Sequence, residues 1–174
     1  MVKKSYSPFN DYFYKYTVNI TDIEKNQLRL FLHNSNKGIF QQKTTYNELN
    51  ILNLPLLKNI REQIISILDE HNLLLSNNWA QLYNKDDKHD VHIHPGSVYS
   101  GIIYIENNEK DGTVFYHPIS KMLESMGKRF IPKIIEEFKS NTLILFPSFI
   151  PHEVLKQNKN NNRLIISFNT IEKN

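Results

Sequence analysis

Apolar residues recur at helical spacing within the first 75 residues. Six of them follow one another at intervals of three and four positions, which places them on one helix face: Leu56, Leu57, Ile60, Ile64, Ile67 and Leu68. Asn53 is the expected N-cap, and Pro55 sits in the first turn, where its missing N–H leaves no hydrogen bond unmade. Thr21 and Glu24 have the spacing of a capping box, so an earlier helix is predicted from Thr21 through about Leu32.

From Asn78 onward the pattern changes to short apolar runs with the periodicity of strands. The predicted strands span about 78–84, 90–94, 98–105, 112–116, 133–138, 142–146, 152–156 and 163–171. Clusters of turn-forming residues separate them. About eight short strands at this spacing are typical of a sandwich or jelly roll, not of a βαβ fold. We therefore predict one domain, 1–174, with a helical N-terminal layer over about 1–75 and a jelly-roll core over about 76–171.

The composition narrows the class of protein. With 174 residues, 40% of them apolar and 22% charged, the chain is expected to fold around one hydrophobic core. It contains no cysteine, which excludes a disulfide scaffold, thiolate metal ligands and a cysteine nucleophile. The 21 basic residues are scattered among 18 acidic ones, so we do not expect a nucleic-acid surface. Asn, Ile and Lys are frequent and Ala is rare, a bias that indicates an AT-rich genome.

No segment of the chain predicts attachment to a membrane. No apolar run reaches the roughly 18 residues that a membrane span requires. The basic start of the chain is not followed by the apolar stretch of a secretory signal. The expected location is the cytoplasm, or the host cytoplasm if the chain is viral.

Two histidines at alternate positions indicate a metal site. In a strand, residues i and i+2 point to the same side, with α-carbons about 6.6 Å apart. His92 and His94 would therefore direct two imidazoles to one point. Imidazole suits iron, zinc, copper and nickel. Alone, the pair is also compatible with two ordinary surface histidines.

A third histidine and a buried arginine add to this pattern. His152 follows the apolar strand predicted at 142–146, and Arg163 heads the final apolar strand. A buried guanidinium needs a partner, and its fork suits a carboxylate. That carboxylate could belong to the protein or to a ligand.

The ordered motifs resemble the Fe(II)/2-oxoglutarate-dependent oxygenases. They are similar to a small group from phages and marine bacteria, distantly akin to prolyl 4-hydroxylases. The resemblance covers about residues 76–170 and lies in five segments: His92-x-His94, Ser100–Ile105, Gly112–Phe115, Leu145–Ser148 with His152, and Arg163–Asn169. It implies a double-stranded β-helix, with Fe(II), 2-oxoglutarate and O₂ used to hydroxylate an unactivated C–H bond.

The resemblance also implies roles for individual residues. His92 and His152 match the family's iron-binding histidines. His94 falls where most relatives carry a carboxylate, and the phage-type group resembles this chain in having histidine there. Arg163 matches the residue that grips the distal carboxylate of 2-oxoglutarate. Four further residues are expected on the cosubstrate side: Tyr104, Tyr83, Ser100 and Ser167. Ile165 stands where relatives often carry serine.

Three functions remain open on the sequence alone. The first is the hydroxylase, acting on a small molecule or a peptidyl, prolyl-like substrate, with a homodimer as its expected assembly. The second is a cupin-like metal enzyme that does not use 2-oxoglutarate, because three histidines are also a cupin ligand pattern. The third is a non-catalytic jelly-roll module with a binding or structural role.

Overall fold

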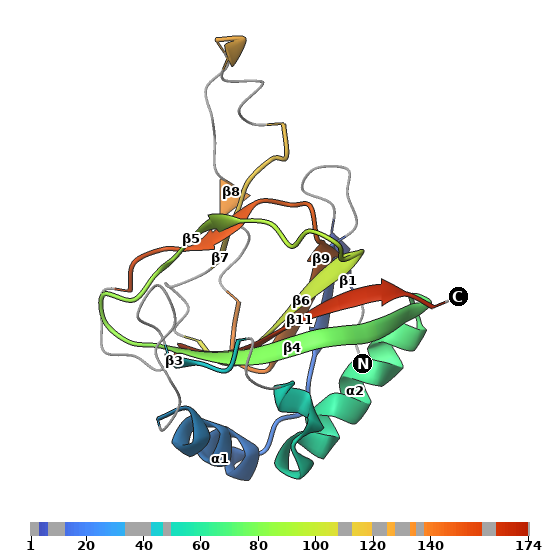
Figure 1. Cartoon of the computed structure of the whole chain (residues 1–174), viewed down its shortest axis with the longest axis vertical. Coiled ribbons are helices and arrows are strands. Elements are labelled where there is room, and N and C mark those ends of the chain that lie inside the picture. The colour runs from blue at the N-terminus through green and yellow to red at the C-terminus, as the bar shows by residue number, and fades with distance from the viewer. Residues whose placement is uncertain are drawn as a thin grey trace.

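A computed structural model gives the fold of the chain. It describes residues 4–6, 13–33, 43–46, 50–107, 113–119, 125–127, 133–134, 138–157 and 163–173. Within these ranges two antiparallel sheets face each other, and two helices cover the outer side of the larger sheet (Figure 1).

The larger sheet has seven strands and the smaller one four. In spatial order the larger sheet consists of β1 (Lys4–Tyr6), β2 (Phe13–Thr17), β9 (Thr142–Pro147), β6 (Tyr99–Glu106), β11 (Arg163–Glu172), β4 (Leu73–Tyr83) and β3 (Lys43–Thr44). The smaller sheet consists of β5 (His89–His92), β10 (His152–Val154), β7 (Thr113–Phe115) and β8 (Lys133–Ile134). The predicted jelly roll is confirmed.

The first helix begins as its capping box predicts. In α1 (Asp22–His33), the Thr21 amide donates to the Glu24 carboxylate at 2.8 Å. The Glu24 amide donates back to the Thr21 hydroxyl at 3.2 Å. The two side chains therefore satisfy two amides that the helix itself leaves without acceptors.

The start of the second helix differs from the prediction. Two 3₁₀ turns, η1 (Ile51–Asn53) and η2 (Pro55–Leu57), precede α2 (Lys58–Asp69). Asn53 is not an N-cap, because it lies inside the first of these turns and its amide donates to the Asn50 carbonyl. Pro55 does open a turn, as expected.

The N-terminal part of the chain is not only helical, which corrects the prediction for about 1–75. β1, β2 and β3 all lie in this region and join the larger sheet. β2 pairs with β9, more than 120 residues away, so the local sequence pattern cannot predict the pairing. β4 also begins earlier than predicted, at Leu73. Within the predicted strand 133–138, β8 covers 133–134, and 135–137 lie outside the described residues.

Alternate residues of the larger sheet serve two separate cores. One set, which includes Ala80, Ile103 and Ile166, packs with the apolar face of the helices. The other set, which includes Tyr83, Tyr104 and Ile165, faces the smaller sheet. This alternation is the ordinary consequence of strand geometry. It places every second residue of β4, β6 and β11 in the space between the sheets.

Gly101 marks a point where two strands leave no room for a side chain. A β-carbon built at this position would lie 2.0 Å from the ring of Phe168, which is fully buried. We expect Gly101→Ala to destabilise the fold by about 3 kcal/mol or more, because overpacking a closed core forces neighbours out of place. Thermal unfolding measures this as a loss of about 6–12 °C in Tm.

The control for this prediction is Gly96→Ala. Gly96 has a φ of +80°, but no atom lies within 4 Å of its added β-carbon. Only backbone strain of about 1–2 kcal/mol should result. Adding Phe168→Leu to Gly101→Ala should restore part of the lost stability. Equal losses in the two alanine variants would contradict the packing argument.

Candidate metal centre

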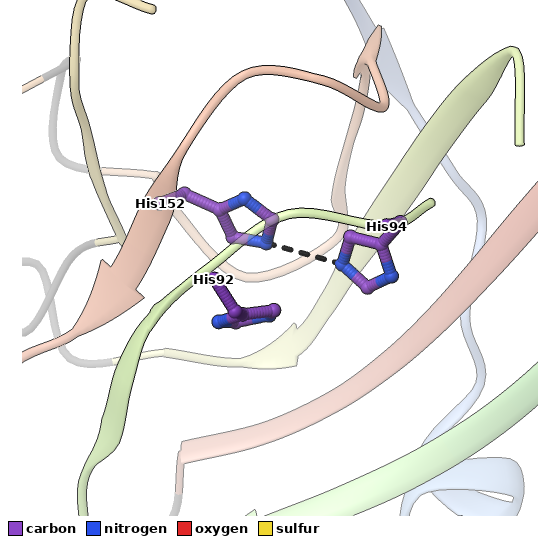
Figure 2. A group of neighbouring side chains, drawn as sticks. All are labelled: His92, His94 and His152. Carbon is purple, nitrogen blue, oxygen red and sulfur yellow. Dashed lines mark hydrogen bonds between the residues drawn. The ribbon is translucent and has the colours of Figure 1, made fainter. Parts of the chain in front are cut away.

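Three histidines converge at one end of the space between the sheets. His92 ends β5, His152 begins β10, and the two are paired in register across the smaller sheet. The Nε2 atoms of His94 and His152 lie 3.3 Å apart (Figure 2). One ring nitrogen from each of the three histidines lies within 4.8 Å of the others. The structure thus brings together residues from distant parts of the chain.

Backbone carbonyls fix the orientation of two of these rings. Nδ1–H of His92 donates to the Asp90 carbonyl at 2.8 Å, and Nδ1–H of His152 donates to the Ile150 carbonyl at 3.0 Å. Because a carbonyl oxygen only accepts, each Nδ1 carries the proton. The lone pair of each Nε2 is therefore free to bind a metal, an arrangement common among metal-binding histidines.

Burial holds the three rings in their neutral form. It lowers the pKa of His92, and it lowers the pKa of His94 to about 3. Burial likewise holds the pKa of His152 well below its usual value, and the neighbouring histidines lower it further. Neutral imidazole is the form that binds metals.

A chain of hydrogen bonds holds His94 in place beyond the end of β5. Its amide donates to the Ser148 carbonyl at 3.0 Å. The Ser148 hydroxyl lies 2.8 Å from that of Ser100, and the Ser100 hydroxyl donates to the Asn169 side chain at 2.8 Å. Ser100, expected to contact the cosubstrate, is thus engaged with the protein in a network that positions a histidine.

Arg163 lies at the start of β11, buried between two tyrosines. Its guanidinium carbon is 5.6 Å from the centre of the Tyr83 ring and 5.3 Å from that of Tyr104. The guanidinium donates to the Thr113 hydroxyl at 2.9 Å and to the Asn107 side chain at 3.2 Å. The Tyr104 hydroxyl lies 2.7 Å from that of Thr113. These contacts hold the guanidinium in a fixed orientation.

The Tyr83 hydroxyl is buried, and no group in the described part of the chain hydrogen-bonds to it. Burial raises the pKa of this phenol, so it keeps its proton and can donate. An unsatisfied buried hydroxyl is costly unless a ligand completes it.

One pocket joins the histidines to the other predicted residues. Its lining includes all three histidines together with Tyr83, Ser100, Thr113, Ile165 and Ser167. Ser167 faces this pocket on β11, as the strand spacing predicts. Arg163 and Tyr104 reach the pocket wall through their contacts with Thr113.

Sequence reasoning missed several residues of this site. No sequence pattern indicated a role for His89, which lies in β5 with its ring centre 4.0 Å from that of His92. Trp79 lines the pocket, with its ring centre 5.7 Å from that of His94. Gln81 also lines the pocket. The signal that could have found Gln81 and Trp79 is their position on β4, two and four residues before Tyr83.

A family of known sequences matches this region. The sequence model described as "Putative 2OG-Fe(II) oxygenase" matches residues 77–169, more than half of the chain. The protein is a 2OG-Fe(II) oxygenase. This membership decides against the cupin-like enzyme that does not use 2-oxoglutarate and against the non-catalytic module.

Solved structures share the fold of this oxygenase at low sequence identity. HygX from Streptomyces hygroscopicus, with nickel and 2-oxoglutarate bound, matches with a TM-score of 0.62 and 12% identity over 91% of this chain and 81% of that one. The prolyl-4-hydroxylase of Pseudomonas putida matches with a TM-score of 0.59 and 12% identity over 95% of each chain.

A viral protein shares the same fold. The collagen prolyl hydroxylase of Paramecium Bursaria Chlorella virus-1, in its 2-oxoglutarate complex, gives a TM-score of 0.57 and 13% identity over 92% of this chain and 96% of that one. No curated protein sequence matches the chain. The helices within the described ranges are too short or too polar to cross a bilayer.

The residues of the site fit the family's metal and cosubstrate. Two nitrogens bound to one ion at about 2.1 Å would lie roughly 3.0–3.4 Å apart for bond angles between a right angle and a tetrahedral one. The 3.3 Å between His94 and His152 falls in this range. The all-imidazole donor set differs from the usual two histidines and one carboxylate. The unsatisfied phenol of Tyr83 on the pocket wall and the buried guanidinium of Arg163 behind Thr113 suit a dicarboxylate.

Proposed function

We propose that His92, His94 and His152 hold Fe(II) and that Arg163, Tyr83 and Tyr104 bind 2-oxoglutarate. The observation that carries this proposal is the convergence of three neutral imidazoles on one point at the end of a pocket. Bound there, Fe(II) and 2-oxoglutarate would activate O₂ for the hydroxylation of an unactivated C–H bond, and 2-oxoglutarate would be oxidised to succinate and CO₂.

The protein's part is to hold, orient and shield these groups. Carbonyls behind His92 and His152 keep their Nε2 atoms directed to the site. Phe115 and Phe146 pack against the His152 ring, with ring centres 5.6 and 4.9 Å away, and keep water from that side. Arg163 offers a charge-assisted hydrogen bond to the distal carboxylate, and the Tyr83 hydroxyl can donate a second one. Ser167 lines the same pocket.

We propose a peptidyl, prolyl-like group as the primary substrate, with a small molecule as the alternative. The shared fold of two prolyl hydroxylases supports this choice. Three statements stay predictions from the sequence: the homodimer, the cytoplasmic location and the single domain over the whole chain.

An anaerobic titration tests the proposal. Fe(II) and 2-oxoglutarate together should produce the weak visible charge-transfer band of a 2-oxoglutarate chelate, at one equivalent of each. Admitting O₂ should then yield succinate. A native chain that binds Fe(II) without producing the band would contradict the 2-oxoglutarate site. A chain that binds no Fe(II) would contradict the whole proposal.

A further inference from the structure

Gln81 places an amide at the site that has no partner within the described part of the chain. It lies in the middle of β4, and its residue is only 4% exposed. Its amide is not one of the fully buried unsatisfied groups of the described residues, so it reaches the open space of the site. Water or a ligand can complete its hydrogen bonds there.

The position of Gln81 connects two spaces. It lines the inner pocket together with His92 and His152. It also lines a wider outer groove that passes Tyr46, Trp79 and His94. His92 and His94 line the groove as well, so the Gln81 amide lies beside the route from the groove to the metal centre.

The hydrogen-bonding capacity of the amide indicates what it faces. A carboxamide has an oxygen that needs a donor and an NH₂ that needs an acceptor. The oxygens of 2-oxoglutarate only accept, so this cosubstrate would leave the Gln81 oxygen unsatisfied. Across the sheet face, the neighbours in register are Ile165, which offers no polar atom, and Thr44. Water can supply this donor in the absence of substrate, and a second ligand that displaces the water has to supply it instead.

The outer groove suits an uncharged ligand. Its described lining contains no Lys, Arg, Asp or Glu, and it combines amide and hydroxyl side chains with three histidines and with aromatic and apolar residues. Tyr46 is half exposed at the groove and meets the Trp79 ring edge to face at 5.0 Å. Apart from an ion held by the histidines, a charged group would find no countercharge among these residues.

We propose that Gln81 is a specificity-determining residue that hydrogen-bonds the primary substrate. The group it recognises is uncharged and both donates and accepts hydrogen bonds, as a secondary amide or an alcohol does, next to the C–H bond that reacts. This inference rests on the proposed function, because it takes the inner pocket as the place of 2-oxoglutarate.

A stability measurement on the metal-free protein tests the first half of the proposal. Gln81→Leu and Gln81→Met remove an amide that has no protein partner in the described part of the chain, so each should leave Tm at the native value or raise it by no more than about 4 °C. Gln63→Leu is the control. The Gln63 amide bonds the Asn19 backbone at 2.8 and 2.9 Å, so this variant should lower Tm. A lower Tm in both Gln81 variants would show a structural role and overturn the proposal.

Cosubstrate affinity is the second measurement. In the Fe(II)-loaded protein under anaerobic conditions, Gln81→Leu should leave the 2-oxoglutarate affinity within twofold of the native value. A loss of tenfold or more would make Gln81 a cosubstrate contact and would overturn the proposal.

Direct observation of the amide tests the second half. The experiment uses NMR spectra of ¹⁵N-labelled protein loaded with Zn(II) and 2-oxoglutarate. The side-chain NH₂ resonances of Gln81 are assigned as those present in the spectrum of the native protein and missing from the spectrum of the Gln81→Leu variant. N-acetylglycine methylamide or glycerol should shift them saturably. The probe that saturates at the lower concentration identifies an amide or an alcohol as the substrate group. N,N-dimethylacetamide, which only accepts, and acetate should bind at least tenfold more weakly.

Three results of this titration would overturn the proposal: equal binding of the acceptor-only probe, preferential binding of acetate, or no saturable shift with any probe up to about 100 mM. The thermal measurement needs neither metal nor 2-oxoglutarate, and the titration can be repeated on the metal-free protein. A failure of the proposed function would therefore be recognised separately, by the missing charge-transfer band in the native chain.

Discussion

His152→Ala should abolish Fe(II) binding and reduce succinate formation by at least about a thousandfold, because the oxidation has no route without the ion. His152 is the most buried of the three histidines, and it supplies the nitrogen that lies 3.3 Å from that of His94. An anaerobic Fe(II) titration followed by a succinate assay measures both effects. Thermal unfolding of the metal-free His152→Ala variant checks that this variant is folded.

His33→Ala is the matched control for this variant. His33 is the last residue of α1, and this helix lies on the outer side of the larger sheet (Figure 1). The His33→Ala variant should bind Fe(II) and form succinate as the native chain does. If His152→Ala kept stoichiometric Fe(II) and near-native turnover, the assignment of the three ligands would be wrong.

Arg163→Gln should weaken 2-oxoglutarate binding by more than about a hundredfold while Fe(II) still binds. Removing the guanidinium loses charge-assisted hydrogen bonds that contribute about 1.5–3 kcal/mol each. Arg163→Lys keeps the charge but loses the planar fork, so we expect an intermediate loss of about 10–100-fold. Titration of the visible band with 2-oxoglutarate on the Fe(II)-loaded protein gives the dissociation constants.

The lysine variant separates the two roles open to Arg163. If its partner carboxylate belonged to the protein, Arg163→Lys would bind 2-oxoglutarate normally and differ mainly in Tm. A graded loss of affinity from arginine to lysine to glutamine supports the cosubstrate role. Full affinity in both variants would remove Arg163 from the site.

The fold could be predicted where the signal is local. The capping box of Thr21 and Glu24 and the apolar stripe of α2 depend on residues within a few positions of one another. β2 could not be predicted, because Phe13–Thr17 is a strand by virtue of its pairing with β9. The true start of α2 was missed because the bends around Asn53 and Leu54 are backbone turns that carry no side-chain cap.

The site could be predicted as far as motifs marked it. The three histidines and Arg163 stand in motifs, and the structure places them around one pocket or against its wall. Gln81 stands in no motif. Its importance depends on its place at the pocket and on the absence of partners in the described structure, and neither can be read from residue order. Ser100 lines the pocket, but its contacts with Ser148 and Asn169 join residues far apart in the sequence and could not be predicted.

The larger sheet separates an apolar core that holds no site residue from a second core that surrounds the site. The cluster shared with the helices lies on one side, and the histidines and the unsatisfied Tyr83 hydroxyl lie on the other. Substitutions that adapt the pocket to a new substrate can therefore accumulate while the helical side keeps the protein folded. Selection can act on the two sides independently, which favours the evolution of new specificities on an unchanged scaffold.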